Sequence, residues 1–192
     1  MVHGNPDERR RQFELVALPL MQRLYTTALR LTGEPDDAAD VLQDTYFRAY
    51  RTFENFRPGT NARAWLFTIL YSVFINRREK LRRQVGPLPS EELERRFQLF
   101  VEQPSHDDVG EREAWGSHWP REIEDALRAL PDLFRAAVLL IDVAELSYEE
   151  AAAVLACPVG TVQSRVFRGR RQLVAALADY ASRAGYPKPE VS

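Results

Sequence analysis

The chain has 192 residues, 45% of them hydrophobic and 28% charged, which is typical of a globular protein with one ordinary domain or two small ones. Its formal net charge of −2 argues mildly against a generally basic nucleic-acid binder, although local clusters of charge decide this more than the sum does. No apolar run is long enough to span a bilayer, and the Arg-rich N-terminus lacks the apolar segment of a signal peptide. Cys157 is the single cysteine, so an internal disulfide is excluded and a reducing, cytoplasmic location is expected.

Helical periodicity predicts a first domain built only from helices. A polar tail over residues 1–12 is followed by apolar residues at helical spacing. Glycine and proline separate the periodic stretches, and Thr60 is a plausible N-cap for the last of them. The expected helices cover residues 13–32, 35–53 and 61–83. Three helices with short connections predict a small bundle over residues 13–83.

The composition changes after Arg83. Residues 84–120 contain prolines, glycines and many charges, which predicts a linker. Within it, Glu91–Val101 has the spacing of a short amphipathic helix. Regular helical patterning returns over residues 121–183, which are expected to form a second helical domain, and residues 184–192 are expected to be a tail.

The second domain contains the pattern of a helix-turn-helix. Ser147 and Glu150 have the spacing of a capping box at the start of a short alanine-rich helix. Cys157 and Pro158 then supply a tight turn, and a last helix is expected over residues 159–183.

The last helix is expected to place Val162 and Val166 on the core and a basic side outward. Such a helix suits the major groove of DNA, because a guanidinium can make paired hydrogen bonds to a guanine edge. A solvated basic helix in a plain bundle is the alternative, but the capping box, short helix and tight turn together favour DNA. The side chains expected to contact DNA are Thr161, Gln163, Ser164, Arg165, Phe167, Arg168 and Arg171.

The second predicted helix has an acidic and aromatic side opposite its apolar side. That side carries Asp40, Gln43, Asp44, Phe47 and Arg51. An exposed aromatic ring among charges is typical of an interface anchor, but lone exposed aromatics are also common, and the spacing leaves both possibilities open for Phe47. The acidic charge favours a basic protein surface over DNA as the partner.

The third predicted helix is apolar on two sides and ends in a basic run. Aromatic rings stack on unpaired bases while Arg and Lys hold the backbone, so the combination suits single-stranded nucleic acid. The alternative is that the rings belong to the core, and it is favoured for Trp65, Phe67 and Phe74 more than for Tyr71.

Patterns of catalysis and metal binding are missing from the sequence. The three histidines have no metal-ligand spacing with Cys157, and there is no nucleotide-binding glycine loop or nucleophile elbow. A nuclease would need carboxylates that converge in a pocket, whereas the acidic residues here follow an exposed helical face. No catalytic residue, cofactor or metal is expected, and the protein is not expected to be an enzyme.

From about Leu15 to Leu177, the chain resembles the ECF (extracytoplasmic-function) group of the sigma-factor family. In the first half the resemblance rests on DAADVLQDTYFRAY (37–50), WLFTIL (65–70) and FIN (74–76). In the second half it rests on ALRALP (126–131), LSYEEAA (146–152) and PVGTVQSRV (158–166).

The resemblance implies a promoter-specificity subunit of RNA polymerase with two small helical domains. The acidic-aromatic face would dock on the clamp of the large polymerase subunit, the last helix would recognise the minus-thirty-five element, and the linker would pass through the polymerase towards the RNA exit path. The loop before the third helix and that helix would melt and recognise the minus-ten element through Phe56, Asn61, Trp65, Tyr71, Arg77 and Arg78.

The resemblance also implies regulation and marks two departures. Such proteins are commonly held inactive by a cognate anti-sigma protein, often membrane-bound or zinc-containing, and the FIN segment resembles the subgroup with zinc-containing partners. Ser72 stands where many relatives carry Asn, which affects minus-ten recognition. Glu145 stands where many carry Gly, which alters the turn before Leu146 and adds a charge that opposes nearby phosphates.

Two other classes of protein fit parts of the pattern. A stand-alone helix-turn-helix regulator would normally carry a sensor or receiver domain with α/β character, and the first half shows none. A structural adaptor would not need Arg165, Arg168 and Arg171 along one helix. Dependence of transcription on polymerase separates both from the sigma factor.

Overall fold

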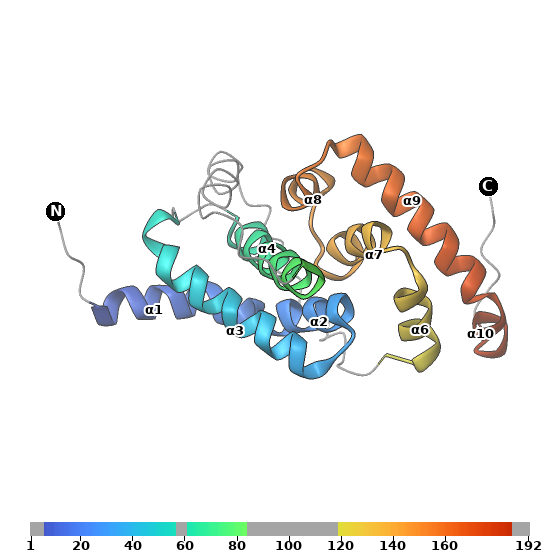
Figure 1. The fold of residues 1–192 in the computed structure, drawn as a ribbon, viewed down its shortest axis with the longest axis horizontal. Coiled ribbons are helices and arrows are strands. Elements are labelled where there is room, and N and C mark those ends of the chain that lie inside the picture. Colours follow the sequence, from blue (N-terminus) through green and yellow to red (C-terminus); the bar gives the residue numbers. More distant parts are fainter. Residues whose placement is uncertain (1–5, 57–60, 84–118, 186–192) are drawn as a thin grey trace.

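The computed structural model describes residues 6–56, 61–83 and 119–185, and in these ranges it contains helices and no strand, which confirms the all-α prediction. The helices form two groups that lie side by side (Figure 1). The first group is α1 (Pro6–Ala17), α2 (Met21–Thr32), α3 (Pro35–Thr52) and α4 (Ala62–Arg83). The second is α6 (Arg121–Ala129), α7 (Asp132–Val138), α8 (Tyr148–Leu155), α9 (Val159–Ala176) and α10 (Ala178–Arg183). The predicted helix Glu91–Val101 and all but the last two residues of the predicted linker lie outside the described ranges.

The helical region starts earlier than the sequence indicated. α1 begins at Pro6 instead of Phe13, and a 3-10 turn at Leu18–Leu20 separates it from α2. Proline suits the first turn of a helix, and two acidic residues follow it there, where the helix dipole favours negative charge. The polar composition of residues 6–12 predicted a tail. These residues instead form the start of α1, which packs on the molecule through the buried side chains of Phe13 and Ala17.

Two other helix ends also differ. Asn61 caps α4, since its Oδ1 accepts a hydrogen bond from the Ala64 N–H at 3.0 Å, and the suggested cap Thr60 lies outside the described residues. The last predicted helix is divided into α9 and α10, with the break at Leu177.

The first group has a core of aliphatic and aromatic side chains. Leu24 and Ala28 of α2 and Val41 of α3 are among its fully buried members. The ring of Phe13 packs edge-on against Tyr50, with centroids 5.3 Å apart. The Tyr46 hydroxyl donates a hydrogen bond to the Ala17 carbonyl at 2.7 Å, and burial raises the pKa of Tyr46 to about 12. These contacts fix α1 on α3.

The second group is built around the contact of α7 with α9. Gly169 of α9 faces α7 so closely that a β-carbon there would lie 2.7 Å from Cγ2 of Val138. A π-helical turn at Leu139–Val143 follows α7 and leads to α8. The small Ala152 of α8 is buried, as expected at a close helix crossing.

α4 connects the two groups. It packs against α2 and α3 on one side and against α8 on the other, so both of its apolar sides are covered (Figure 1). A three-helix bundle alone would have left one side exposed. As a result, the buried residues of both groups form one continuous cluster.

Candidate nucleic-acid and polymerase interfaces

The helix-turn-helix has the local geometry that the sequence predicted. The Ser147 hydroxyl accepts from the Glu150 N–H at 3.1 Å, and the Glu150 carboxylate accepts from the Ser147 N–H at 2.7 Å, which confirms the capping box. Ala156 ends α8 in the left-handed conformation, with φ of 50°. Pro158 then precedes α9, so the turn between the two helices is short.

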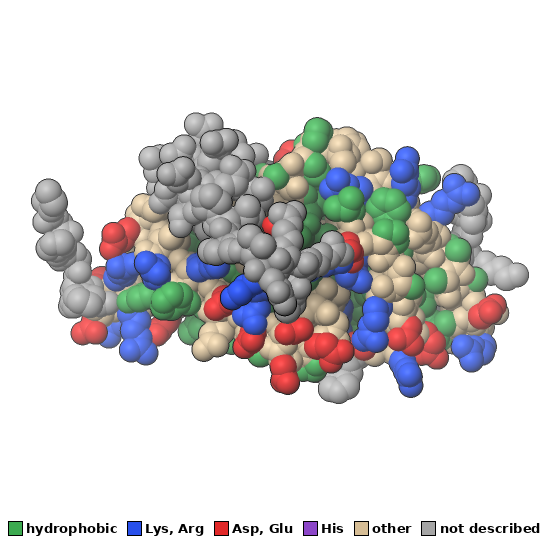
Figure 2. Space-filling view, in the orientation of Figure 1, with side chains coloured by type: hydrophobic (Ala, Val, Ile, Leu, Met, Phe, Trp, Pro, Cys, Tyr) green, Lys and Arg blue, Asp and Glu red, His purple; other side chains and the backbone are tan. Residues whose placement is uncertain are grey.

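α9 buries one side and exposes the other. Val162 and Val166 are almost completely buried. Of the side chains predicted to contact DNA, Thr161 and Arg165 are half-buried, and the exposed ones are Gln163, Ser164, Phe167, Arg168 and Arg171. Figure 2 shows Lys and Arg side chains along the outer edge of the molecule over this helix. The exposed side therefore combines positive charge with hydroxyl and amide groups, which are the groups that bind base edges and phosphates.

Two arginines of α9 have partners within the domain. The Arg165 guanidinium lies 3.5 Å from Sγ of Cys157. Arg170 makes two bonds to the Asp142 carboxylate, at 2.5 and 3.1 Å, and this hydrogen bonding raises the pKa of Arg170. Arg170 is consequently held against the π-helical turn, with 51% of its side chain exposed.

The acidic and aromatic side of α3 is exposed as predicted. Phe47 has 61% of its surface exposed, and the Arg51 guanidinium lies 5.6 Å from the centre of its ring. Asp40 and Gln43 are exposed and Asp44 is half-buried. This side remains accessible in the arrangement of the two groups, as an interface for a partner requires.

Arg77, predicted to contact DNA, lies beside the acidic side of α3. Its guanidinium pairs with Asp40 at 2.5 Å and with Asp44 at 2.9 Å. Burial by itself lowers the pKa of Arg77, but the hydrogen bonds to both carboxylates outweigh it, so the pKa is raised. The pairing reduces the negative charge that α3 presents.

Three of the other residues predicted for the minus-ten element are buried in this arrangement, whereas Phe56 and Arg78 are half-buried. Asn61, Trp65 and Tyr71 are 2%, 4% and 8% exposed. The half-buried Phe56 ring packs on Trp65, with centroids 4.8 Å apart. The sequence favoured a core position for Trp65, Phe67 and Phe74 but less so for Tyr71, and all four are buried.

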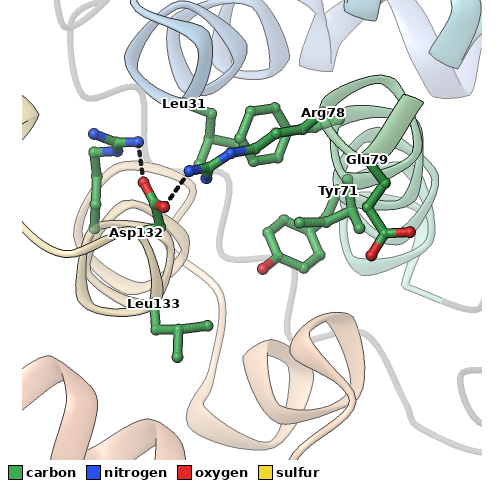
Figure 3. A pocket seen from close by; sticks show the side chains of 9 residues that line it. Leu31, Tyr71, Arg78, Glu79, Asp132 and Leu133 are labelled. Atoms are coloured by element: carbon green, nitrogen blue, oxygen red, sulfur yellow. Dashed lines mark hydrogen bonds and ion pairs between the residues drawn. The ribbon is translucent and has the colours of Figure 1, made fainter. Parts of the chain in front are cut away.

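A polar interface between the two groups was not predicted. The Asn61 amide donates to the Glu150 carboxylate, Arg23 pairs with Glu145 at 2.8 Å, and Arg78 pairs with Asp132. Figure 3 shows Asp132 accepting from Arg78 of α4 and from Arg135 of its own helix, beside a pocket of about 250 Å³ that Tyr71 also lines.

A second contact lies at the other end of α2. The Arg30 guanidinium is 4.1 Å from the ring centre of Trp119 and 3.5 Å from a Glu124 oxygen. Burial lowers the pKa of Arg30, and Glu124 acts in the opposite direction. Two features of the sequence bear on this interface, namely the two apolar sides of α4 and the unusual Glu145, which adopts φ of 56°.

Among the described residues, no cluster of three or more His, Cys, Asp or Glu side chains could hold a metal ion. None of the helices in the same ranges is long and apolar enough to cross a membrane. An exposed basic side on the second helix of a helix-turn-helix, together with a separate exposed aromatic-acidic face on α3, places the molecule in the class of all-helical helix-turn-helix proteins.

Comparison with known proteins identifies the family. The family model for sigma-70 region 2 matches residues 18–84, and the model for sigma-70, region 4 matches residues 121–173. The chain is 37% identical to the ECF RNA polymerase sigma factor EcfG of Rhodopseudomonas palustris, over 85% of this chain and 82% of that protein. It is 38% identical to the ECF RNA polymerase sigma factor SigE of Mycolicibacterium smegmatis over 83% of this chain. The matched region covers 59% of SigE.

Solved structures agree. The sigma factor RpoE of Bartonella quintana, in complex with the anti-sigma factor NepR, superposes with a TM-score of 0.62 at 30% identity, covering 88% of this chain and 98% of RpoE. CnrH, in complex with the cytosolic domain of CnrY, gives a TM-score of 0.60 at 25% identity over 92% of this chain and 91% of CnrH. The chain belongs to the sigma-70 family, in the ECF group of RNA polymerase sigma factors.

Proposed function

We propose that this chain directs core RNA polymerase to a set of promoters by using three separate surfaces. α9 recognises the minus-thirty-five element, α4 with the segment before it recognises the minus-ten element, and α3 binds the clamp of the large polymerase subunit. Residues 13–83 and 121–183 serve as sigma regions 2 and 4. The observation that carries the proposal is the exposed side of α9, because Arg168 and Arg171 project from a helix whose other side is fixed in a capped helix-turn-helix.

The α3 surface supports the part of the proposal that concerns polymerase. Phe47 is a large exposed ring beside carboxylates, and aromatic anchors surrounded by charge dominate the binding free energy of many interfaces. A DNA backbone would be repelled by Asp40 and Asp44, even with Arg77 beside them.

We also propose that an anti-sigma protein controls the chain. The structurally similar sigma factor RpoE was solved bound to the anti-sigma factor NepR, and the similar CnrH was solved bound to the cytosolic domain of CnrY. The chain acts on transcription inside the cell and supplies no catalytic group of its own. On α3, Asp40 and Asp44 are paired with Arg77.

In-vitro run-off transcription tests the proposal. Purified chain is added to bacterial core polymerase with a genomic promoter library, and transcripts that require the chain are sequenced. Specific transcripts sharing two upstream elements are expected. Absence of binding to core polymerase would overturn the proposal and favour a stand-alone helix-turn-helix regulator.

A further inference from the structure

A pocket of about 420 Å³ lies where the end of α2 meets α6 and α7 (Figure 1). None of the described residues that line it belongs to the surfaces proposed for DNA or polymerase. We propose that this pocket binds the phosphate group of a small molecule through three guanidinium groups, those of Arg30, Arg128 and Arg135. The site is additional to the proposed function and does not depend on it.

Arg30 contributes a buried guanidinium group whose hydrogen bonds are incomplete. Its side chain is 4% exposed, and its Nη1 donates to the Thr26 carbonyl at 3.3 Å. Among the described residues, Nε and Nη2 of Arg30 have no hydrogen-bond acceptor, and the Trp119 ring lies with its centre 4.1 Å from Cζ. Buried donors without acceptors cost free energy, so a ligand that brings oxygen atoms to this group is bound favourably.

Glu124 stands next to Arg30, where the phosphate would bind. Its Oε1 lies 3.5 Å from Nη2 of Arg30, which is longer than a good hydrogen bond, and its side chain is 36% exposed. Burial lowers the pKa of Arg30, and the charge of Glu124 opposes this lowering without cancelling it. The carboxylate can rotate towards solvent and leave Nη2 to an anion that has more charge and more oxygen atoms.

Arg135 is the second cation of the pocket, and its side chain is 12% exposed. Its Nη2 donates to Asp132 at 2.8 Å and its Nη1 to the Arg128 carbonyl at 3.2 Å, while its Nε is buried with no acceptor among the described residues. Burial lowers the pKa of Arg135, although Asp132 acts in the opposite direction. The nearby charges of Arg78 and Arg128 lower this pKa further, so positive charge is concentrated at this pocket.

Arg128 supplies the third guanidinium group from the exposed side of α6. Its Nε lies 3.9 Å from the place that a β-carbon on Gly33 would take, so the side chain reaches from α6 to the turn after α2. Because Arg128 is exposed, it can reorient onto a ligand. It can also be replaced without opening a cavity in the core.

The charge of the pocket favours phosphate over a carboxylate ligand. Among the described residues that line it, the three arginines face two carboxylates, those of Glu34 and Glu124. A phosphate group carries about −1.5 to −2 charge at pH 7 and has three strong acceptor oxygens. It can therefore accept from guanidinium groups on three different helices, which the two oxygens of a carboxylate do less well.

The size and lining of the pocket favour a small molecule over a nucleic-acid backbone. Its volume falls within the range of about 300–1,000 Å³ that is usual for small-molecule sites. Leu29, Leu127 and Trp119 also line it and offer apolar surface to the part of a ligand that carries no charge. A DNA backbone could reach Arg128 at the surface but not the buried guanidinium group of Arg30.

Isothermal titration calorimetry of the full chain tests the site with two probes, inorganic phosphate and adenosine 5′-monophosphate, at an ionic strength held constant with sodium chloride. Arg128→Gln should weaken binding about tenfold, because it removes a charge-assisted contact. Arg121→Gln is the control, since Arg121 is 91% exposed on the same helix and does not line the pocket. It should leave the affinity unchanged.

Glu124→Gln tests the site in the opposite direction. It removes a negative charge beside the phosphate and should strengthen binding about threefold, a gain that damage to the fold would not produce. Glu122→Gln, at an exposed residue of α6 outside the pocket, should leave the affinity unchanged.

The two probes distinguish the sources of the phosphate. Tighter binding of adenosine 5′-monophosphate indicates a phosphate ester, equal or tighter binding of inorganic phosphate indicates the free ion, and both results support the site. The site is refuted if neither probe binds at millimolar concentration, if each pocket variant behaves like its control, or if a short DNA duplex displaces the bound probe. Transcription is not measured in this experiment, so its failure would leave the proposed function standing.

Discussion

Substitution of Gly169 by alanine should destabilise the second helical group. A β-carbon at this position would lie 2.7 Å from Cγ2 of Val138, and 3.5 Å from both the β-carbon and the carbonyl oxygen of Phe134. Carbon atoms do not approach to 2.7 Å without a shift, so either Val138 must rotate or α9 must move away from α7.

The size of the effect is a difference between two terms. Adding a methyl group to a filled core costs about 1–3 kcal/mol. Replacing glycine by alanine inside a helix returns about 0.5–1 kcal/mol, because the unfolded chain loses freedom and the helix gains propensity. The free energy of unfolding should therefore fall by about 1–2 kcal/mol.

Gly160 provides the matched control, because it also lies in α9 but a β-carbon at that position would meet no neighbouring group within 4 Å. Gly160→Ala should leave stability unchanged or raise it by less than about 1 kcal/mol. Urea unfolding of the full chain, followed by the helix signal in circular dichroism, measures both. Equal stability of the two variants would show that the α7–α9 contact is not close-packed and would refute the reasoning.

Three further substitutions probe the proposed surfaces and the helix-turn-helix. Phe47→Ala should weaken binding to core polymerase without loss of stability, because the ring is mostly exposed. Leu15→Ala, at a residue 74% exposed on α1, is the control and should leave the affinity for polymerase unchanged. Equal affinity of both variants would remove α3 from the interface. Arg168→Ala should make the free energy of binding to promoters with a matching minus-thirty-five element less favourable by about 1–3 kcal/mol. Arg170→Ala, at a side chain held by Asp142, is the control and should leave this binding unchanged. An equal loss on every DNA sequence would make Arg168 a phosphate contact. Ser147→Ala should lower the free energy of unfolding by about 1 kcal/mol through loss of the cap, and an unchanged urea midpoint would contradict that role.

Local features of the fold could be predicted because they depend on neighbouring residues. The capping box needs only Ser147 and Glu150 at the right spacing, and the outward side of α9 follows from the burial of Val162 and Val166. The exposure of Phe47 also follows from its place opposite the apolar side of α3, whereas its role as an interface anchor stays a prediction.

Features that depend on distant residues could not be predicted in the same way. The sequence assigned Arg77 to DNA because it belongs to a basic run, but its partners Asp40 and Asp44 are on another helix. Tyr71 seemed available to unpaired bases because a three-helix bundle cannot bury two sides of one helix. The second helical group covers that side, and the periodicity of α4 shows that the side is apolar but cannot show which element covers it.

The two-sided character of α4 is explained by its position between the two helical groups. An apolar side of this helix that met only solvent would favour aggregation. The second helical group covers that side with a buried contact at Asn61 and with partly exposed ion pairs at Arg23 and Arg78. Each ion pair contributes little free energy, so the burial of Tyr71 and of the other apolar side chains of α4 accounts for most of the stability of this contact.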